Sequence, residues 1–410
     1  MNSIAKLENV ALVNNDIYIN KLNHPSCASA FNLRMRTLMI RGVKNTNIYI
    51  NCDRSGIFPN AALPVAVMIL DSEKLYGIRC EIVYCPDYLL KAYFVSPLEA
   101  NEECVCTLKN PLNTIFRYSN IDGQISSIMQ AYVDYLSKHV QCESGVLDSL
   151  IWCINEVLDN VQVHSQDKFG YVMAQYHKKK KRLNFCVFDS GIGILESLNK
   201  SPVFSPESDL EAIELALKEG VGEGNGQGNG LFGLYRIVSE NSGRLTIRSG
   251  NAAITVKNGV KTAYTDDNFV LPGGHKGTTV DFQLDLSQSI NLQEAMGRIP
   301  FDGFDIRVDD MWLDENTLLY DINEHSKDTG TRASGKEIRL DILNILNRRE
   351  AHIVLDFSSV EYASSSFLDE SIAILFSENP YLVECVSLAN MNETIEYLFK
   401  RSMAIRTKME

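Results

Sequence analysis

Residues 219–238 read EGVGEGNGQGNGLFGLYRIV, a segment with glycine at almost every second position that leads directly into an amphipathic helical pattern. Backbone N–H groups of such a segment, together with the dipole at the start of the helix, can surround the phosphates of a nucleotide. No Gly-Lys-Ser/Thr follows, so the segment is not a P-loop. It also does not open a βαβ unit, as a dinucleotide-binding fingerprint would. A flexible linker would not run straight into a helix, so we predict a phosphate-binding loop of another kind.

A second motif lies upstream, on a helix predicted over 144–165. In INEVLDNVQVHS (154–165), Glu156, Asn160 and His164 recur every four residues, which places them on one face of a helix. A carboxylate there can polarise a water or hydroxyl, and a carboxamide oxygen beside it can hold hydrated Mg²⁺. A solvated polar face has the same spacing, so this motif does not identify a site by itself.

The third motif is FDSGIGI at 188–194, where a predicted strand ends in Asp189. Gly191 and Gly193 follow at alternate positions, where the backbone must turn tightly or let a flat ligand come close. A buried carboxylate can accept a hydrogen bond from an exocyclic amine such as that of adenine. Taken alone, the motif is equally consistent with an ordinary turn.

In this order and spacing, the three motifs resemble the ATP-binding domain of the GHKL family, which includes gyrase-type ATPases, MutL, heat-shock chaperones, histidine kinases and anti-sigma-factor kinases. The resemblance implies that Glu156 is the general base, that Asn160 binds Mg²⁺ and that Asp189 binds the adenine amine. HKGTTVDFQL (275–284) matches the Gly-Thr strand that closes the family's adenine pocket. The further positions assigned to ATP binding are His164, Gly191, Gly193, Gly226, Gly228, Gly230, Leu231, Gly277 and Thr278.

The element order of residues 121–290 predicts an α+β sandwich. Two helical patterns precede two strand-like runs, and the glycine-rich stretch, a helix and further strands follow. This order suggests helices on one face of a mostly antiparallel sheet. The basic run HKKKKR (177–182) lies between the first two strands, so we expect it at a solvated hairpin tip and not in a binding patch.

Two flanking segments, 47–70 and 352–376, share a pattern. Each has an apolar strand that ends at an aspartate (Asp53, Asp356), a serine-containing turn and an apolar helix, with another predicted strand beyond. This repeated β-α-β-α order favours parallel strand pairs. We therefore predict a mixed α/β and α+β protein. Its parts are an N-terminal α/β domain (1–120), a GHKL domain (121–290), a connector (291–317) and a C-terminal α/β domain (318–410).

The C-terminal stretch LDFSSVEYASSSFLDES (355–371) resembles a STAS or STAS-like domain, the class of protein that anti-sigma-factor kinases phosphorylate on serine. The resemblance places the phosphoacceptor at Ser365. Ser364 and Phe367 replace the aspartate and glycine of the family's loop, and the same run also reads as an ordinary helix cap. Both interpretations stay open. CDRSGIFPNAA (52–62) is a weaker match, so the N-terminal domain is interpreted as a degenerate STAS-like module.

Composition narrows the class of protein. The net charge is −13 and the pI is near 5.1, so nucleic acid is not favoured as a partner. The longest apolar runs are too short to span a bilayer, and the first residues do not read as a secretory signal, so we expect a soluble cytoplasmic protein. Ten cysteines lack paired spacing, and those within apolar runs (Cys153, Cys186, Cys385) are expected to be reduced core thiols.

Two roles for the ATP remain open. The sequence shows no helix pair that bears an acceptor histidine, which disfavours a histidine-kinase role. It also shows no clear downstream transducer lysine, which disfavours a gyrase or MutL role. The E-x3-N-x3-H spacing is closest to anti-sigma-factor kinases. One role is a nucleotide-driven switch acting through STAS-like domains on a partner or on the chain itself; the other is a serine kinase. ATP and Mg²⁺ are the expected cofactors and a homodimer the expected assembly. A bacterial regulator and an anti-phage defence ATPase both fit.

Overall fold

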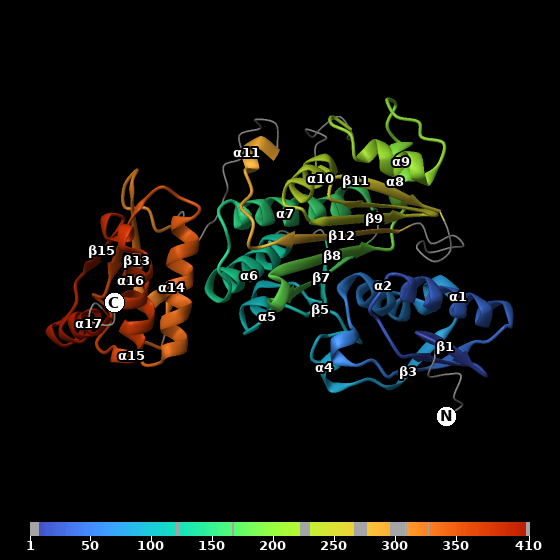
Figure 1. Cartoon of the computed structure of the whole chain (residues 1–410). Coiled ribbons are helices and arrows are strands. Elements are labelled where there is room, and N and C mark those ends of the chain that lie inside the picture. The colour runs from blue at the N-terminus through green and yellow to red at the C-terminus, as the bar shows by residue number, and fades with distance from the viewer. Residues whose placement is uncertain are drawn as a thin grey trace. The chain divides into compact units, whose positions relative to one another are not determined.

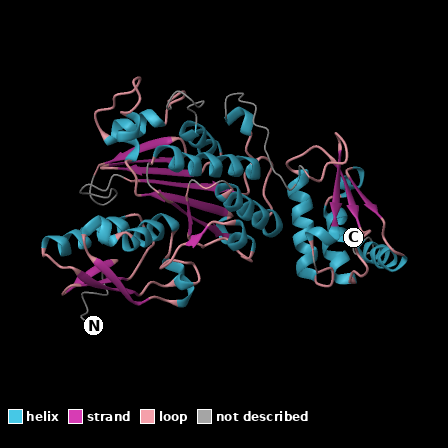
Figure 2. Ribbon diagram, turned by 180° about the vertical axis from the view of Figure 1, so that it is seen from behind, coloured by secondary structure: helices cyan, strands magenta, loops and turns pink. Residues whose placement is uncertain are grey.

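The computed structural model describes residues 8–119, 121, 123–165, 168–221, 230–265, 277–295, 308, 310–326 and 328–406 (Figures 1 and 2). The chain divides into two compact units, which are described separately. The larger comprises Met1–Tyr132, Ile151–Asp285 and Glu294–Gly297, and the smaller comprises Val133–Leu150, Leu286–Gln293 and Arg298–Glu410. Within the described ranges, no helix is both long and apolar enough to cross a membrane.

The larger unit begins with a small sheet. Strand β1 pairs antiparallel with β2, and β2, β3 and β4 pair in parallel and in sequence order. Helix α1 joins β2 to β3, and α2 and α3 join β3 to β4. The bounds are β1 (Val10–Val13), β2 (Asp16–Ile19), α1 (Ser26–Ile40), β3 (Asn45–Ile50), α2 (Pro59–Leu70), α3 (Ser72–Tyr76), β4 (Arg79–Tyr84) and α4 (Asp87–Leu90). The parallel strand pairs predicted for this segment are confirmed.

The central sheet has the strand order β11-β10-β9-β12-β8-β7-β6-β5 and is antiparallel except between β5 and β6. The mostly antiparallel sheet expected here is confirmed. Its strands are β5 (Leu98–Glu99), β6 (Phe116–Tyr118), β7 (Gly170–His177), β8 (Arg182–Asp189), β9 (Arg244–Ser249), β10 (Ala252–Lys257), β11 (Val260–Tyr264) and β12 (Thr278–Asp285). The predicted β7–β8 hairpin has its lysines exposed in a 3₁₀ turn, Lys178–Lys180, so that tip is a solvated turn.

Helices lie on both faces of this sheet. Helices α7 and α10 lie on one face, and α2 packs on the other, against β7, β8 and β12 (Figure 1). The helices between the strands are α5 (Glu102–Cys106), α6 (Gln124–His139), α7 (Val146–His164), α8 (Gly193–Leu198), α9 (Asp209–Ala216) and α10 (Gly230–Glu240). The expectation of helices on one face concerned residues 121–290; the other face is covered by α2, from outside that block, which is apolar on almost all sides and buries its outer side against the central sheet.

The two sheets of the larger unit share one hydrophobic core. Tyr171, Met173, Cys186 and Phe188, on the side of β7 and β8 that faces α2, belong to the same buried cluster as the N-terminal layer. Strand β8 is buried along almost its whole length, which is the pattern of a strand covered on both faces.

A polar cluster is buried between α2 and the sheet. The Asn60 side-chain amide donates to Oδ2 of Asp281 at 3.1 Å, and Arg248 Nη2 donates to the Asn60 carbonyl at 3.1 Å. Asp281 is 1% exposed and Arg248 is 4% exposed. Burial raises the pKa of Asp281 to about 6, although Asn60, Arg244 and Arg248 act in the opposite direction. The carboxylate is therefore held in its charged form at a cost to folding stability.

This pKa predicts an unusual pH dependence. The folded state binds the Asp281 proton more tightly than the unfolded chain does, so the free energy of unfolding falls as pH rises from about 4 to about 6. The full effect is about 3 kcal/mol. Asp281→Asn cannot ionise and should lack this slope. Urea unfolding of both proteins from pH 4.5 to 7.5 measures the difference, and a difference that is constant over this range contradicts the assignment.

The smaller unit contains a three-stranded parallel sheet in the order β13-β14-β15, again in sequence order. The β-α-β-α order with parallel strand pairs, predicted for both flanks, is therefore confirmed. Its elements are α11 (Leu292–Ala295), which continues into the larger unit, β13 (Thr317–Asp321), α13 (Ile322–His325), α14 (Arg332–Leu346), β14 (His352–Asp356), α15 (Ser365–Leu368), α16 (Ile374–Glu378), β15 (Val386–Ala389) and α17 (Glu393–Arg406). A π-helical turn, Asp369–Ala373, joins α15 to α16.

Candidate functional site

A pocket of about 570 Å³ opens in the larger unit between α7, α10 and the ends of β8 and β12. This volume lies within the range of small-molecule sites in proteins, roughly 300–1,000 Å³. Its wall is mixed, with Val157, Leu198 and Val280 beside carboxylate, amide, imidazole and hydroxyl groups. A flat apolar ring carrying a few polar atoms would suit such a wall.

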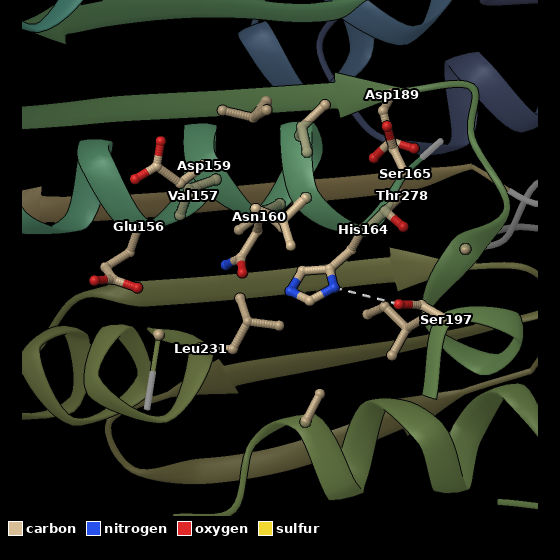
Figure 3. A pocket seen from close by; sticks show the side chains of 18 of the residues that line it. Glu156, Val157, Asp159, Asn160, His164, Ser165, Asp189, Ser197, Leu231 and Thr278 are labelled. Carbon is tan, nitrogen blue, oxygen red and sulfur yellow. Dashed lines mark hydrogen bonds between the residues drawn. The ribbon is translucent and has the colours of Figure 1, made fainter. Parts of the chain in front are cut away.

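Helix α7 contributes the polar side of the pocket. Glu156, Asn160 and His164 project from the same side of α7, toward Leu231 of α10, as Figure 3 shows. The shared face predicted from their spacing is therefore confirmed. The opposite side of α7 is buried, with Cys153, Ile154, Leu158 and their neighbours in the core. This apolar side fixes the rotation of the helix and so aims the three polar side chains into the pocket.

Burial changes the chemistry of Glu156. Desolvation, together with the nearby Asp159 carboxylate, raises the pKa of Glu156 above its ordinary value. Proton transfer is most efficient when the pKa of the base lies close to the working pH, so the shift is in the direction that would suit a general base. The Asn160 amide nitrogen is buried and has no hydrogen-bond partner among the described residues. A carboxamide beside a carboxylate is a ligand set suited to hydrated Mg²⁺.

Asp189 lies at the end of β8, on the pocket side of the sheet. It is buried, and its Oδ1 accepts the N–H of Gly191 at 2.8 Å. Gly277 lies directly beside it, because a Cβ placed on Gly277 would be 2.1 Å from the Asp189 carbonyl oxygen. Thr278 follows in β12 and lines the same pocket, with its hydroxyl 3.3 Å from that of Ser249. Two motifs almost 90 residues apart thus meet at the end of the sheet.

The first turn of α10 brings in the glycine-rich segment. A Cβ on Gly230 would lie 2.5 Å from Oε2 of Glu156 and 3.4 Å from the Asn160 amide nitrogen, so a larger residue there would displace the Glu156 carboxylate. Leu231 and Gly193 also line the pocket, and Gly193 begins α8 with a φ of +79°. Gly226 and Gly228 lie outside the described residues. Gly191 is packed against the backbone of Ser165, at the end of α7.

Sequence reasoning did not identify Asp159, Ser165 or Ser197 as pocket residues. The Ser197 hydroxyl lies 3.4 Å from Nδ1 of His164 and therefore helps to orient the imidazole ring. Asp159 directly precedes Asn160 in the motif, so its position in the sequence could have indicated that it lines the pocket. Ser197 lies on α8 with no distinctive neighbours, so nothing local indicated it.

The carboxyl ends of β14 and β15 form a second polar region, in the smaller unit. Asp356 accepts hydrogen bonds from the Ser358 N–H at 3.0 Å, from its hydroxyl at 2.8 Å and from the Asn390 amide at 2.8 Å. Desolvation is the largest single effect and raises the pKa of Asp356, but the three hydrogen bonds together hold that pKa below its usual value. The aspartate therefore stabilises the loop that follows β14.

The family model described as "STAS-like domain of unknown function (DUF4325)" matches residues 334–396, which include β14, β15 and this loop. The C-terminal domain is STAS-like. The match does not include the pocket of the larger unit. None of the curated proteins matches the chain.

In the STAS-like domain, the serine run forms a helix cap. Ser364 is the N-cap residue of α15, and its hydroxyl oxygen accepts the Phe367 N–H at 3.0 Å. The capping interpretation is confirmed for Ser364. Ser365 and Ser366 are exposed in the first turn of α15. An exposed serine at a helix start is also accessible to modification, so the geometry is compatible with both interpretations of Ser365.

The close approach of Gly277 to Asp189 gives a testable prediction. Gly277→Ala places a methyl group against a backbone oxygen that cannot move without shifting β8, so the free energy of unfolding should fall by about 1–3 kcal/mol. Gly56→Ala is the matched control, since a Cβ there meets no atom within 4 Å. Urea unfolding compares the two, and equal stabilities would show that β8 and β12 are not in contact at this point.

Proposed function

We propose that the chain is a Mg²⁺-dependent GHKL-type ATPase whose nucleotide state controls its STAS-like domain. The observation that carries the proposal is the meeting of four separate stretches at one pocket: the α7 face, the Asp189 turn, the Gly277–Thr278 strand and the first turn of α10. Their order along the chain is that of the GHKL motifs. The N-terminal layer, with its matching element order, is a degenerate STAS-like module under this proposal.

The pocket suggests how ATP would be held. The Asp189 carboxylate, aligned by the Gly191 N–H, accepts a hydrogen bond from the adenine amine. Val280 and Leu198 pack against the purine ring, and Leu231 lies nearer the sugar and phosphates. Gly230 lies at the start of an 11-residue helix, where the free N–H groups favour a phosphate.

Asn160 and the nucleotide phosphates would hold Mg²⁺, which supplies positive charge to neutralise the phosphates. Glu156, with its raised pKa, takes the proton of the attacking group. If that group is water, the products are ADP and phosphate and the switch resets. If it is a serine hydroxyl, the Oγ–P bond forms as the bond between the γ-phosphorus and the bridging oxygen breaks.

The serine kinase is therefore the second candidate function. The observation that favours it is the exposed Ser365 in the first turn of α15, in a domain of the STAS-like class. The substrate is this serine or the equivalent serine of a separate protein. For either function we propose a cytoplasmic homodimer. An ATPase flanked by interaction modules would also serve as a component of anti-phage defence.

Two substitutions separate binding from turnover. Asp189→Ala removes the carboxylate that accepts the adenine amine and should weaken ATP binding at least about ten-fold, with little effect on GTP. Glu156→Ala should bind ATP with nearly unchanged affinity and hydrolyse none. Fluorescent-nucleotide titration and phosphate release measure the two properties, with Glu214→Gln on the exposed side of α9 as the control. Full turnover by Glu156→Ala would refute its role as the base.

Labelled ATP distinguishes the switch from the kinase. If the chain is a kinase acting on itself, label from γ-³²P-ATP stays on the protein, persists in Ser366→Ala and disappears in Ser365→Ala. Both serines are exposed in the same helical turn, so the pair controls for structural damage. Release of free phosphate with no label on the chain or on an added STAS-domain protein leaves only the switch.

A further inference from the structure

Helix α14 of the STAS-like domain and the turn that follows it carry buried polar side chains. Asp341 and Asn344 are completely or almost completely buried, and the Arg348 side chain is 3% exposed. Together with Asn347 they contact residues 133–150, which belong to the same compact unit and form the end of α6, the connecting turn and the start of α7. We call Asp341, Asn344, Asn347 and Arg348 the α14 latch. Polar groups buried in such number are retained at a contact only when each is paired.

Asn344 caps helix α6 from a position about 200 residues further along the chain. Its amide nitrogen donates to the carbonyls of Ser137 at 2.7 Å and Val140 at 2.9 Å, and its Oδ1 accepts the Cys142 N–H at 3.0 Å. The last carbonyls of a helix have no partners within that helix, so Asn344 satisfies groups that α6 cannot. Asn347 adds a bond from its amide to the Cys142 carbonyl at 3.1 Å.

Asp341 ties this turn to the sheet of the STAS-like domain. One carboxylate oxygen accepts the Ser137 hydroxyl of α6, and the other accepts the Tyr320 hydroxyl of β13 at 2.9 Å. Both hydroxyls help to stabilise the fully buried carboxylate, because a buried charge is costly unless it is hydrogen-bonded. The position of α6 is thereby fixed relative to β13.

Arg348 holds the first turn of α7. Its Nε and Nη2 atoms lie 3.1 and 2.9 Å from Oδ1 of Asp148, which is the acidic residue of that turn. Helix α7 then continues without a break to Glu156, Asn160 and His164. The helix that carries the catalytic face of the proposed ATP site therefore starts at the latch.

We propose that the α14 latch is a releasable docking surface through which the STAS-like domain tightens nucleotide binding. Docking orders the α6–α7 turn before a nucleotide binds. The protein therefore loses less conformational entropy when a nucleotide binds against α7. By linkage, bound nucleotide strengthens docking by the same factor. The hydrogen bonds across the contact come from polar side chains, and contacts between domains are more polar than those of obligate complexes. This inference rests on the proposed ATP site.

The surface on α6 and α7 also defines what can replace the latch. An undocked turn exposes the Ser137, Val140 and Cys142 carbonyls, the Cys142 N–H and the Asp148 carboxylate. The matching partner is the end of a helix that presents a carboxamide four residues before a guanidinium, as Asn344 and Arg348 do. The α14 of a second STAS-like domain has this chemistry.

Nucleotide titration of latch variants in the full-length chain tests the proposal. Asn344→Ala and Arg348→Ala should each weaken binding of a non-hydrolysable ATP analogue about five-fold or more, the lower end of ordinary allosteric coupling. Arg332→Ala is the matched control: it removes an arginine at the exposed start of the same helix, paired with Asp369 and Glu370, and should change affinity less than two-fold. If Asn344→Ala or Arg348→Ala does not fold, the less disruptive substitutions Ser137→Ala and Arg348→Lys test the same contacts.

Hydrogen exchange gives the reciprocal measurement, since the Cys142 amide is bonded directly to Asn344. The analogue should slow exchange of that amide about five-fold in the unmodified chain and not in Arg348→Lys. If the unmodified chain binds the analogue and the folded variants bind it equally well, the latch proposal is overturned and the ATP site stands. If the unmodified chain binds no nucleotide, both fail.

Discussion

The pocket depends on the close approach of α10 to the polar face of α7. A Cβ on Gly230 would meet the ends of the Glu156 and Asn160 side chains, and a Cβ on Gly277 would meet the Asp189 backbone. At these two contacts the first turn of α10, the Glu156–Asn160 pair and the Asp189 carboxylate come together around a single cavity. A larger residue at Gly277 would force β12 away from the end of β8, and one at Gly230 would force the Glu156 carboxylate to move.

The strands that form the pocket also carry the core on their opposite face. Along β8 and β12, Asp189 and Val280 face the pocket, whereas Phe188 and Asp281 face α2. The N-terminal layer is thus a structural support of the pocket, because it buries the back of the sheet. Burying the charged Asp281 carboxylate in the Asp281–Asn60–Arg248 cluster costs folding free energy. Buried polar contacts of this kind can instead specify how two layers align.

Local patterns predicted much of this arrangement. The four-residue spacing of Glu156, Asn160 and His164 placed them on one face, and the serine run before Phe367 predicted the start of α15, because helix periodicity and capping depend on neighbouring residues. The packing of α2 on the central sheet could not be predicted, since an all-apolar helix does not specify its partner. Nor could the capping of α6 by Asn344, which joins residues about 200 positions apart.

A structure of the full-length chain determined with Mg²⁺ and a non-hydrolysable ATP analogue tests the central claim most directly. The account predicts the purine amine within hydrogen-bond distance of Asp189, the metal ion beside the Asn160 oxygen and the γ-phosphate near Glu156 and the first turn of α10. A nucleotide bound elsewhere, or one in the pocket with its phosphates beside Asp189, would contradict it.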